Sequence, residues 1–396
     1  MLIGLIGKPS VGKSTFFKAA TLAEVEIASY PFTTIKPNHG VGYVKVDCIE
    51  REMNTKCMPN HGFCIKGIRF VPIDLMDVAG LVPGASEGKG LGNRFLDDLR
   101  QADAFIQIVD LSGETDAEGK LLEGKSYDIC NDVRFLEDEL NKWYFNILSK
   151  VWKTFSKQLD SGKDINYPRA IANQFSGLGV KEEHAKAVFR KLGIDEHLSR
   201  WTPKQILEFA SLLRKESKPM IIAANKVDTE KGSENLKKLK EAFPDKMIMP
   251  CSSDSELALR EAAKHGLIEY IPGENDFKII KGLNDRQKRA LETIRGDVLS
   301  VYGGTGVQEI LNKAVFELLG YLAIFPASAN RLMDSKGRIL PDCFLLPPGS
   351  TALDFAFFLH TDFGNNFIKA IDAKSKMALG KEYVLKNRDA LEIVTR

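Results

Sequence analysis

The feature that most constrains this chain is a short glycine-containing segment near its start, GKPSVGKS, from Gly7 to Ser14. It follows an almost wholly apolar run, Met1 to Ile6, and opens a helical pattern from Gly12 to about Ala23. This is the pattern G-x-x-x-x-G-K-[ST] in the strand-then-helix context that identifies a phosphate-binding loop. Glycine lets the backbone wrap closely around a phosphate, and a helix N-terminus offers it unpaired amides and a positive dipole end. The segment therefore predicts a nucleotide-binding loop.

Two side chains of this loop have specific expected roles. Lys13 should reach the β- and γ-phosphate oxygens, and Ser14 should supply an oxygen to Mg²⁺. The residues expected to contact the nucleotide are Gly7, Lys8, Pro9, Ser10, Val11, Gly12, Lys13, Ser14 and Thr15.

Four further apolar runs predict the rest of a sheet. Each is short and ends in a polar or glycine-containing turn: Phe70–Met76, Ala104–Val109, Met220–Ala224 and Met247–Met249. Buried strands alternating with helical patterns predict an α/β domain with a mostly parallel sheet. Ligands on such sheets bind at the carboxyl ends of the strands.

Two stretches depart from this alternation and predict further domains. Residues 123–217 show long helical periodicity, and a buried strand resumes directly after them, so we expect an all-helical insertion into a domain formed by 1–122 and 218–275. A few ordinary surface helices are the alternative. Residues 276–320 should form a helical connection that packs on this domain, with a helix from Val307 to about Leu322.

The last part of the chain, 321–396, predicts a small mixed α+β domain. A helix near Ala352–His360 interrupts five strand-like runs: Leu322–Phe325, Cys343–Leu346, Phe367–Ile371, Tyr383–Leu385 and Glu392–Val394.

A second motif, Asp77-Val78-Ala79-Gly80, lies at the end of the predicted strand Phe70–Met76. An acidic residue there can hold Mg²⁺ through water, and the Gly80 amide can meet a γ-phosphate. D-x-x-G alone is a weak signal, but its place after a buried strand and a phosphate loop strengthens it.

A third motif, Asn225-Lys226-Val227-Asp228, follows the predicted strand Met220–Ala224. The Asp228 carboxylate can accept hydrogen bonds from N1–H and the 2-amino group of guanine, whereas adenine would leave it unpaired. Lys226 should lie along the base, and Asn225 should brace the phosphate loop. The motif therefore predicts guanine specificity.

Bulk properties exclude several classes of protein. The formal net charge is +2 over 396 residues, so a nucleic-acid partner is neither demanded nor excluded. No apolar run reaches the roughly 18 residues of a membrane span. Six cysteines do not make a disulfide framework in a chain this long, and the opening run is too short for a signal peptide. We expect a cytoplasmic protein.

Together these motifs resemble the Obg branch of P-loop GTPases over most of the chain. Tyr30-Pro31-Phe32-Thr33-Thr34 is similar to the Obg first switch, and the segment from Asp77 through Gly92 to Leu96 is similar to its glycine-rich second switch. Pro347-Pro348-Gly349-Ser350-Thr351 with Asp354-Phe355-Ala356 resembles a TGS domain, a small β-grasp module. The helical insertion and this domain are most similar to the YchF-type subgroup.

The resemblance implies further site residues. Thr34 would bind Mg²⁺ and the γ-phosphate, and would act in hydrolysis with Lys13 and Gly80. Pro250-Cys251-Ser252-Ser253 resembles the base-sandwiching fifth motif, which would make Ser252 and Ser253 nucleotide contacts, with the Ser253 amide facing the guanine oxygen. Ser10 stands where potassium-activated relatives carry asparagine, which puts potassium stimulation in doubt.

The expected activity is hydrolysis of GTP with Mg²⁺ by a nucleotide-dependent switch. Leu81 stands where Ras-like GTPases place the glutamine that orients water, and leucine makes no such hydrogen bond, so intrinsic turnover should be slow. Resemblance implies a ribosome or RNA partner in translation or stress control. YchF-type proteins often carry an altered fourth motif and prefer ATP. That motif is intact here, which favours GTP. An ATP-binding regulatory protein is the alternative, and a small-molecule phosphotransferase is disfavoured.

A cysteine cluster is the remaining candidate site. Cys48, Cys57, His61 and Cys64 could hold zinc, although C-x3-H-x2-C is not a common finger spacing. A structural loop with free thiols, or one disulfide, is the alternative.

Overall fold

The computed structural model describes nine stretches of the chain: residues 1–21, 38–78, 80–84, 99–123, 127–162, 166–193, 197–328, 332–334 and 336–396. Thr33, Thr34 and most of the glycine-rich second switch lie outside these residues. The metal-binding and catalytic roles expected of Thr34 therefore stay predictions.

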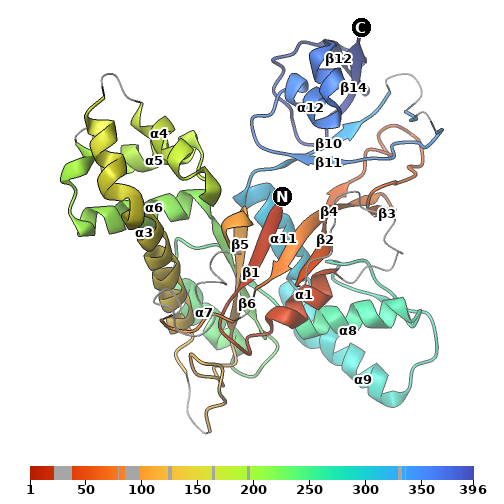
Figure 1. The fold of residues 1–396 in the computed structure, drawn as a ribbon. Helices are drawn as coiled ribbons and strands as arrows, with labels where there is room; N and C mark the ends of the chain where they lie inside the picture. The colour runs from red at the N-terminus through yellow and green to blue at the C-terminus, as the bar shows by residue number, and fades with distance from the viewer. Residues whose placement is uncertain are drawn as a thin grey trace.

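The centre of the molecule is a seven-stranded sheet with the order β2-β4-β1-β5-β6-β7 (Figure 1). The seventh strand, β3, pairs with the start of β4 on the edge opposite β2. The five predicted runs form the parallel part: β1 (Leu2–Ile6), β4 (Ile68–Asp77), β5 (Ala104–Asp110), β6 (Met220–Asn225) and β7 (Ile248–Pro250). The predicted α/β class with a mostly parallel sheet is confirmed.

Two antiparallel strands extend this sheet beyond the prediction. β2 (His39–Asp47) and β3 (Phe63–Ile65) both pair antiparallel with β4. Gly40 and Gly42 dilute the apolar pattern of β2, and each is needed for packing. A Cβ on Gly42 would lie 2.6 Å from Leu75 Cδ1, and one on Gly40 would lie 2.7 Å from Phe17 Cζ. Glycine in a strand marks close approach of this kind.

Helices cover both faces of the sheet because successive strand residues point to opposite sides. On one face, Ile3 and Leu5 pack with α1 (Lys13–Thr21) and α11 (Val307–Asn312). The opposite face packs against two helices of the insertion, α3 (Cys130–Asp160) and α6 (Pro203–Ser217). It also packs against α7 (Gly232–Ala242), which follows the Asn225–Asp228 motif.

Between β5 and β6, every element described from Cys130 onward is a helix. The chain leaves the sheet through α3, turns through α4 (Tyr167–Gln174) and α5 (Glu182–Leu192), and returns along α6. Trp152 of α3 stacks on Trp201 with ring centroids 5.3 Å apart. This aromatic contact lies within one hydrophobic cluster that continues to the sheet face.

The connection after β7 is also mainly helical. It contains α8 (Ser253–Lys264), a two-stranded sheet of β8 (Ile268–Glu269) and β9 (Lys278–Ile279), α9 (Asp285–Thr293) and α10 (Ser300–Tyr302). The helix predicted from Val307 to about Leu322 begins as α11 and widens into a π-helix over Lys313–Leu318. Gly320, with a φ of 66°, ends it before the next strand begins.

The C-terminal part forms a five-stranded sheet in the order β11-β10-β14-β12-β13. Its elements are β10 (Leu322–Pro326), β11 (Phe344–Leu346), α12 (Ala352–Leu359), α13 (Thr361–Asn365), β12 (Phe367–Asp372), β13 (Ala378–Leu379) and β14 (Ala390–Thr395). The strand predicted at Tyr383–Leu385 is wrong. Val384 makes only one bridge, to Thr351, and the Leu385 side chain is buried in the core of this domain.

The C-terminal domain lies near the amino ends of the central strands, on the side where β1 begins (Figure 1). Arg69 of β4 donates from Nη2 to Leu340 O over 2.7 Å, and the Met58 amide donates to Ile339 O over 2.8 Å. The carboxyl ends of the strands therefore face away from this domain. Among the helices of the described residues, none is long and apolar enough to cross a membrane.

Candidate nucleotide-binding site

The phosphate loop lies at the carboxyl end of β1, and two glycines shape it. Gly7 and Gly12 have φ values of 154° and 92°. A Cβ on Gly7 would lie 2.6 Å from Ile108 O, and one on Gly12 would lie 2.4 Å from Asn225 Nδ2. Both positions therefore require glycine for backbone conformation and for space.

Lys13 is buried at the start of α1, and its Nζ donates to Lys8 O over 2.6 Å. Burial lowers the pKa of this ammonium to about 8, against the opposing effect of the Asp77 carboxylate. The ammonium is thus held across the loop, where an anionic phosphate would favour its charged form and raise its pKa again.

Ser14 and Asp77 come together from α1 and the end of β4. The Ser14 hydroxyl donates to Asp77 Oδ2 over 2.8 Å. A hydroxyl and a carboxylate side by side are the oxygen ligands that Mg²⁺ prefers, so these residues fit that ion. Gly80 lies against the loop, because a Cβ there would be 2.7 Å from Pro9 N, and the next amide, Leu81 N, donates to Gly7 O over 3.0 Å.

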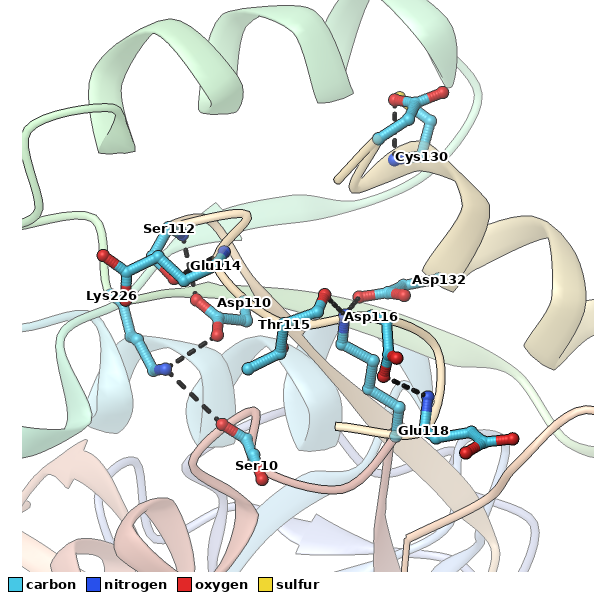
Figure 2. Close-up of polar contacts among 12 residues, drawn as sticks. Ser10, Asp110, Ser112, Glu114, Thr115, Asp116, Glu118, Cys130, Asp132 and Lys226 are labelled. Atoms are coloured by element: carbon cyan, nitrogen blue, oxygen red, sulfur yellow. Dashed lines mark hydrogen bonds and ion pairs between the residues drawn. The ribbon is translucent and has the colours of Figure 1, made fainter. Parts of the chain in front are cut away.

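The guanine motif is tied to the phosphate loop by two side chains. Asn225 donates from Nδ2 to Val11 O over 2.9 Å, which is the bracing contact expected from the sequence. Lys226 lies across the loop and donates to Ser10 O over 3.4 Å (Figure 2). The Asp228 carboxylate is exposed to solvent and available to a base.

An acidic residue that the sequence analysis did not single out holds Lys226. Asp110, the last residue of β5, is 1% exposed and lies 2.7 Å from Lys226 Nζ (Figure 2). The Ser112 amide donates to the other oxygen of Asp110 over 2.9 Å. An acidic residue that ends a buried strand at the ligand-binding edge of the sheet is the signal that could have found it.

The roles expected of Ser252 and Ser253 are wrong as stated. The Ser252 amide donates to Thr305 O, and its hydroxyl caps α8 by accepting from the Ser255 amide. The Ser253 amide, expected to face the guanine oxygen, donates instead to Asn225 Oδ1 over 3.0 Å. The next amide, that of the exposed Asp254, has no acceptor among the described residues.

Lys8 also differs from the expectation, because its side chain turns away from the loop. It is 2% exposed, its Nζ donates to Thr115 O over 2.9 Å, and it lies 3.1 Å from Asp132 Oδ2 at the start of α3. The ammonium also lies 4.0 Å from the centre of the Tyr127 ring. Only the backbone of Lys8 can therefore contact a nucleotide.

Family models match most of the chain. Residues 2–139 match a model described as a 50S ribosome-binding GTPase, residues 223–328 match an Obg-like GTPase YGR210-like, G4 motif-containing domain, and residues 335–395 match a TGS domain. An uncharacterized GTP-binding protein of Methanocaldococcus jannaschii is 48% identical, over 100% of this chain and 99% of that protein. The chain belongs to the Obg-like family of GTP-binding proteins.

Two further relatives place this Obg-like protein within the family. The crystal structure of a GTP-binding protein from Pyrococcus horikoshii is similar with a TM-score of 0.79 and 38% identity, over the full length of both chains. A protein of Bacillus subtilis named ribosome-binding ATPase YchF is 26% identical, over 98% of this chain and 97% of that protein. The predicted family and the C-terminal TGS domain are confirmed.

Lys13 predicts a pH dependence of nucleotide affinity in this Obg-like protein. Its pKa of about 8 should rise when a phosphate binds, so binding takes up a proton above that pH. Triphosphate affinity should be full below about pH 8 and fall by up to about tenfold per pH unit above it. Titration of a fluorescent GTP analogue across this range measures the slope. A Lys13→Ala variant should lack it, and a flat profile in the unsubstituted protein would contradict the prediction.

The Lys8–Asp132 pair predicts a loss of stability when it is broken. Burial raises the pKa of Asp132 to about 6, although Lys8 opposes that shift, so this carboxylate depends on its partner. Lys8→Met should lower the free energy of unfolding by about 3–5 kcal/mol, because it leaves a buried charge unpaired. Urea unfolding near neutral pH measures this. Lys120→Met, which removes an exposed pair with Glu118, is the control and should change little.

The cysteine cluster differs from the predicted set by one residue. His61 lies outside it, because its Nδ1 is 2.7 Å from Asp342 Oδ1 of the C-terminal segment. Glu50 takes its place beside Cys48, Cys57 and Cys64. The spacing of the cysteines does not point to a carboxylate, and the sequence alone gives no sign that the turn after β2 brings Glu50 back toward the thiols.

Proposed function

We propose that this Obg-like protein hydrolyses GTP to GDP and phosphate and works as a nucleotide-dependent switch. Lys13 would bind the β- and γ-phosphates, and the Gly80 amide would meet the γ-phosphate. Ser14, Asp77 and Thr34 would hold Mg²⁺, which when bound would neutralise charge that develops on the phosphates. The pairing of Ser14 with Asp77 at 2.8 Å supports this assignment.

The observation that carries the switch proposal is that the start of α3 contacts both nucleotide loops. Asp132 pairs with Lys8 of the phosphate loop. About two helical turns further along α3, Glu139 Oε1 accepts from the Gly84 amide of the second switch over 2.8 Å. A change in either loop on γ-phosphate release would therefore act directly on the first turns of α3. The helical insertion is the element through which the nucleotide state would be transmitted.

Guanine would be read by two groups at the ends of β6 and β7. The exposed Asp228 carboxylate would accept from N1–H and the 2-amino group. The Asp254 amide, which has no acceptor within the described part of the chain, would donate to the guanine oxygen. Lys226, held in place by Asp110, would lie along the base. An ATP-binding role is the second candidate, favoured by the name of the Bacillus subtilis relative, and a higher affinity for ATP than for GTP would support it.

Intrinsic turnover is proposed to be slow because Leu81 lies in the core and not at the phosphates. Its side chain is 1% exposed and belongs to the hydrophobic cluster formed with Leu136 and Leu140 of α3. The Leu81 side chain therefore cannot orient the attacking water. A partner or a backbone group would have to supply that contact.

Leu81→Ala should therefore affect stability more than chemistry. Removing this buried side chain should cost about 2–5 kcal/mol of unfolding free energy, while basal kcat per folded molecule should stay within about threefold. Urea unfolding and single-turnover hydrolysis measure the two effects. Leu121→Ala, at a position 78% exposed, is the control. Loss of basal turnover with unchanged nucleotide affinity would mean that Leu81 acts at the phosphates.

The division of the chain is proposed as predicted from the sequence. A nucleotide-binding domain of 1–122 and 218–275 would carry the helical insertion 123–217, the helical connection 276–320 and the TGS domain 321–396. A hydrophobic cluster of its own supports the last of these: Ile324, Leu346, Phe355, Leu385 and Leu391.

The proposed partner is the ribosome, reached through the helical insertion and the TGS domain, which implies a cytoplasmic location. Support comes from the ribosome-binding names of the matched family model and the Bacillus subtilis relative. Co-sedimentation with ribosomal subunits in GDP, GTP and a non-hydrolysable analogue tests it. Binding should be strongest with the triphosphate forms, and binding that ignores the nucleotide would overturn the switch model.

A further inference from the structure

Three thiols and one carboxylate meet where the chain leaves β2. Cys48 follows the last residue of β2, Glu50 and Cys57 belong to the connection that comes next, and Cys64 lies in β3. One ligand atom from each of the four lies within 4.8 Å of all the others. All the cysteines of the chain are free thiols, so no disulfide accounts for the cluster.

The spacing of these atoms suits a small ion with soft ligands. A tetrahedral zinc site with bonds of about 2.3 Å to sulfur and 2.1 Å to oxygen has its ligand atoms about 3.5–3.8 Å apart. The cluster would thus need to contract by only about 1 Å to close around zinc. We propose that Cys48, Glu50, Cys57 and Cys64 form a structural site for a zinc-class divalent ion.

Groups next to the cluster would balance part of the charge of these ligands and would orient one of them. Three thiolates and a carboxylate around a divalent ion leave a net charge of −2. Arg69 is fully buried beside them, with Nη2 3.9 Å from Cys48 Sγ, and its Nε has no hydrogen-bond partner among the described residues. The Cys57 amide donates to Glu50 Oε2 over 2.9 Å, which fixes the carboxylate in the way outer-shell groups orient metal ligands.

The position of the site indicates what the ion would do. The connection after Cys48 has only turns between β2 and β3, and its far end docks the C-terminal segment. Met58 and Asn60 donate backbone hydrogen bonds of 2.8 Å to Ile339 O and Pro341 O. An ion that joins Cys57 to both strands would hold this connection in the shape that receives the segment leading to β11. The ion would therefore stabilise the contact between the nucleotide-binding and TGS domains.

Metal analysis of the full-length protein tests the site. Protein expressed with zinc in the medium and purified without chelator should contain about one zinc per chain, and cobalt exchanged into the site should show the intense near-ultraviolet absorption of thiolate ligation. Cys57→Ser and Cys64→Ser should retain less than about a tenth of the zinc. Cys130→Ser, a buried thiol at the start of α3, is the matched control and should keep all of it.

A second measurement covers the case in which the ligand variants fail to fold. Removal of the metal from the unsubstituted protein by a zinc chelator should lower its thermal midpoint, and added zinc should restore it. Proteolysis between the two domains should quicken in the chelated protein and slow again with zinc. An unsubstituted protein that carries no zinc and gives no thiolate band with cobalt would overturn the site. So would zinc retained in both ligand variants, or an intact mass lower by two hydrogens, which would show a disulfide instead.

Discussion

Asp228→Asn should weaken GTP binding by roughly 10²–10⁴-fold, because two hydrogen bonds to a charged acceptor are lost or reversed. An asparagine amide can accept from guanine N1–H but points a donor at the 2-amino group, which is itself a donor. Xanthine carries an oxygen at that position, so affinity for xanthosine triphosphate should rise as affinity for GTP falls. Competition titrations with GTP, ATP and xanthosine triphosphate measure the change.

The control for this experiment is Asp245→Asn, which alters an exposed aspartate after α7 and should leave all three affinities unchanged. The same titrations separate the two candidate functions. If the unsubstituted protein prefers ATP, or if Asp228→Asn leaves the affinity for GTP intact, then Asp228 does not read guanine and the GTP assignment fails.

Lys13→Ala should lower kcat for GTP hydrolysis by at least about 10²–10³-fold. The ammonium is the one charged side chain that the described phosphate loop directs across its own backbone, since Lys8 is committed to Asp132. Its loss removes stabilisation of the charge that grows on the transferred phosphoryl group. Single-turnover assays at saturating nucleotide isolate this effect from binding.

Lys18→Ala provides the matched control, because it removes an exposed lysine from the same helix. Hydrolysis in that variant should equal that of the unsubstituted protein. Turnover that survives Lys13→Ala would show that the observed activity belongs to a contaminant or to a site elsewhere in the molecule.

Motifs anchored to buried strands were predicted well, because strand and loop together leave few conformations. Gly12, Lys13 and Ser14 follow an apolar run that can only be a central strand, and Asn225 braces their loop across the sheet. Edge elements were harder. β2 carries two glycines whose purpose, close approach to α1 and β4, depends on tertiary packing that no local pattern contains.

The direction in which a polar group points was harder to predict from the sequence. The backbone amide of Ser253 donates to Asn225, and the ammonium of Lys8 pairs with Asp132; both partners are distant in the chain. The same holds for Glu50, which joins the thiols only because the chain turns after β2. Such pairings depend on how separate elements pack, so residue type and spacing could nominate these positions but not orient them.

The length of α3 has a mechanical consequence. Its 31 residues form one continuous helix about 46 Å long. At one end Asp132 and Glu139 bind Lys8 and the Gly84 amide, and the other end lies away from the sheet (Figure 1). A tilt of α3 by about 5° about the end that carries Asp132 and Glu139 would move its far end by about 4 Å. Displacements at the phosphates too small to alter a binding surface locally would thus be magnified at the tip. The first turns of α3, beside the phosphate loop, would be the pivot of this motion.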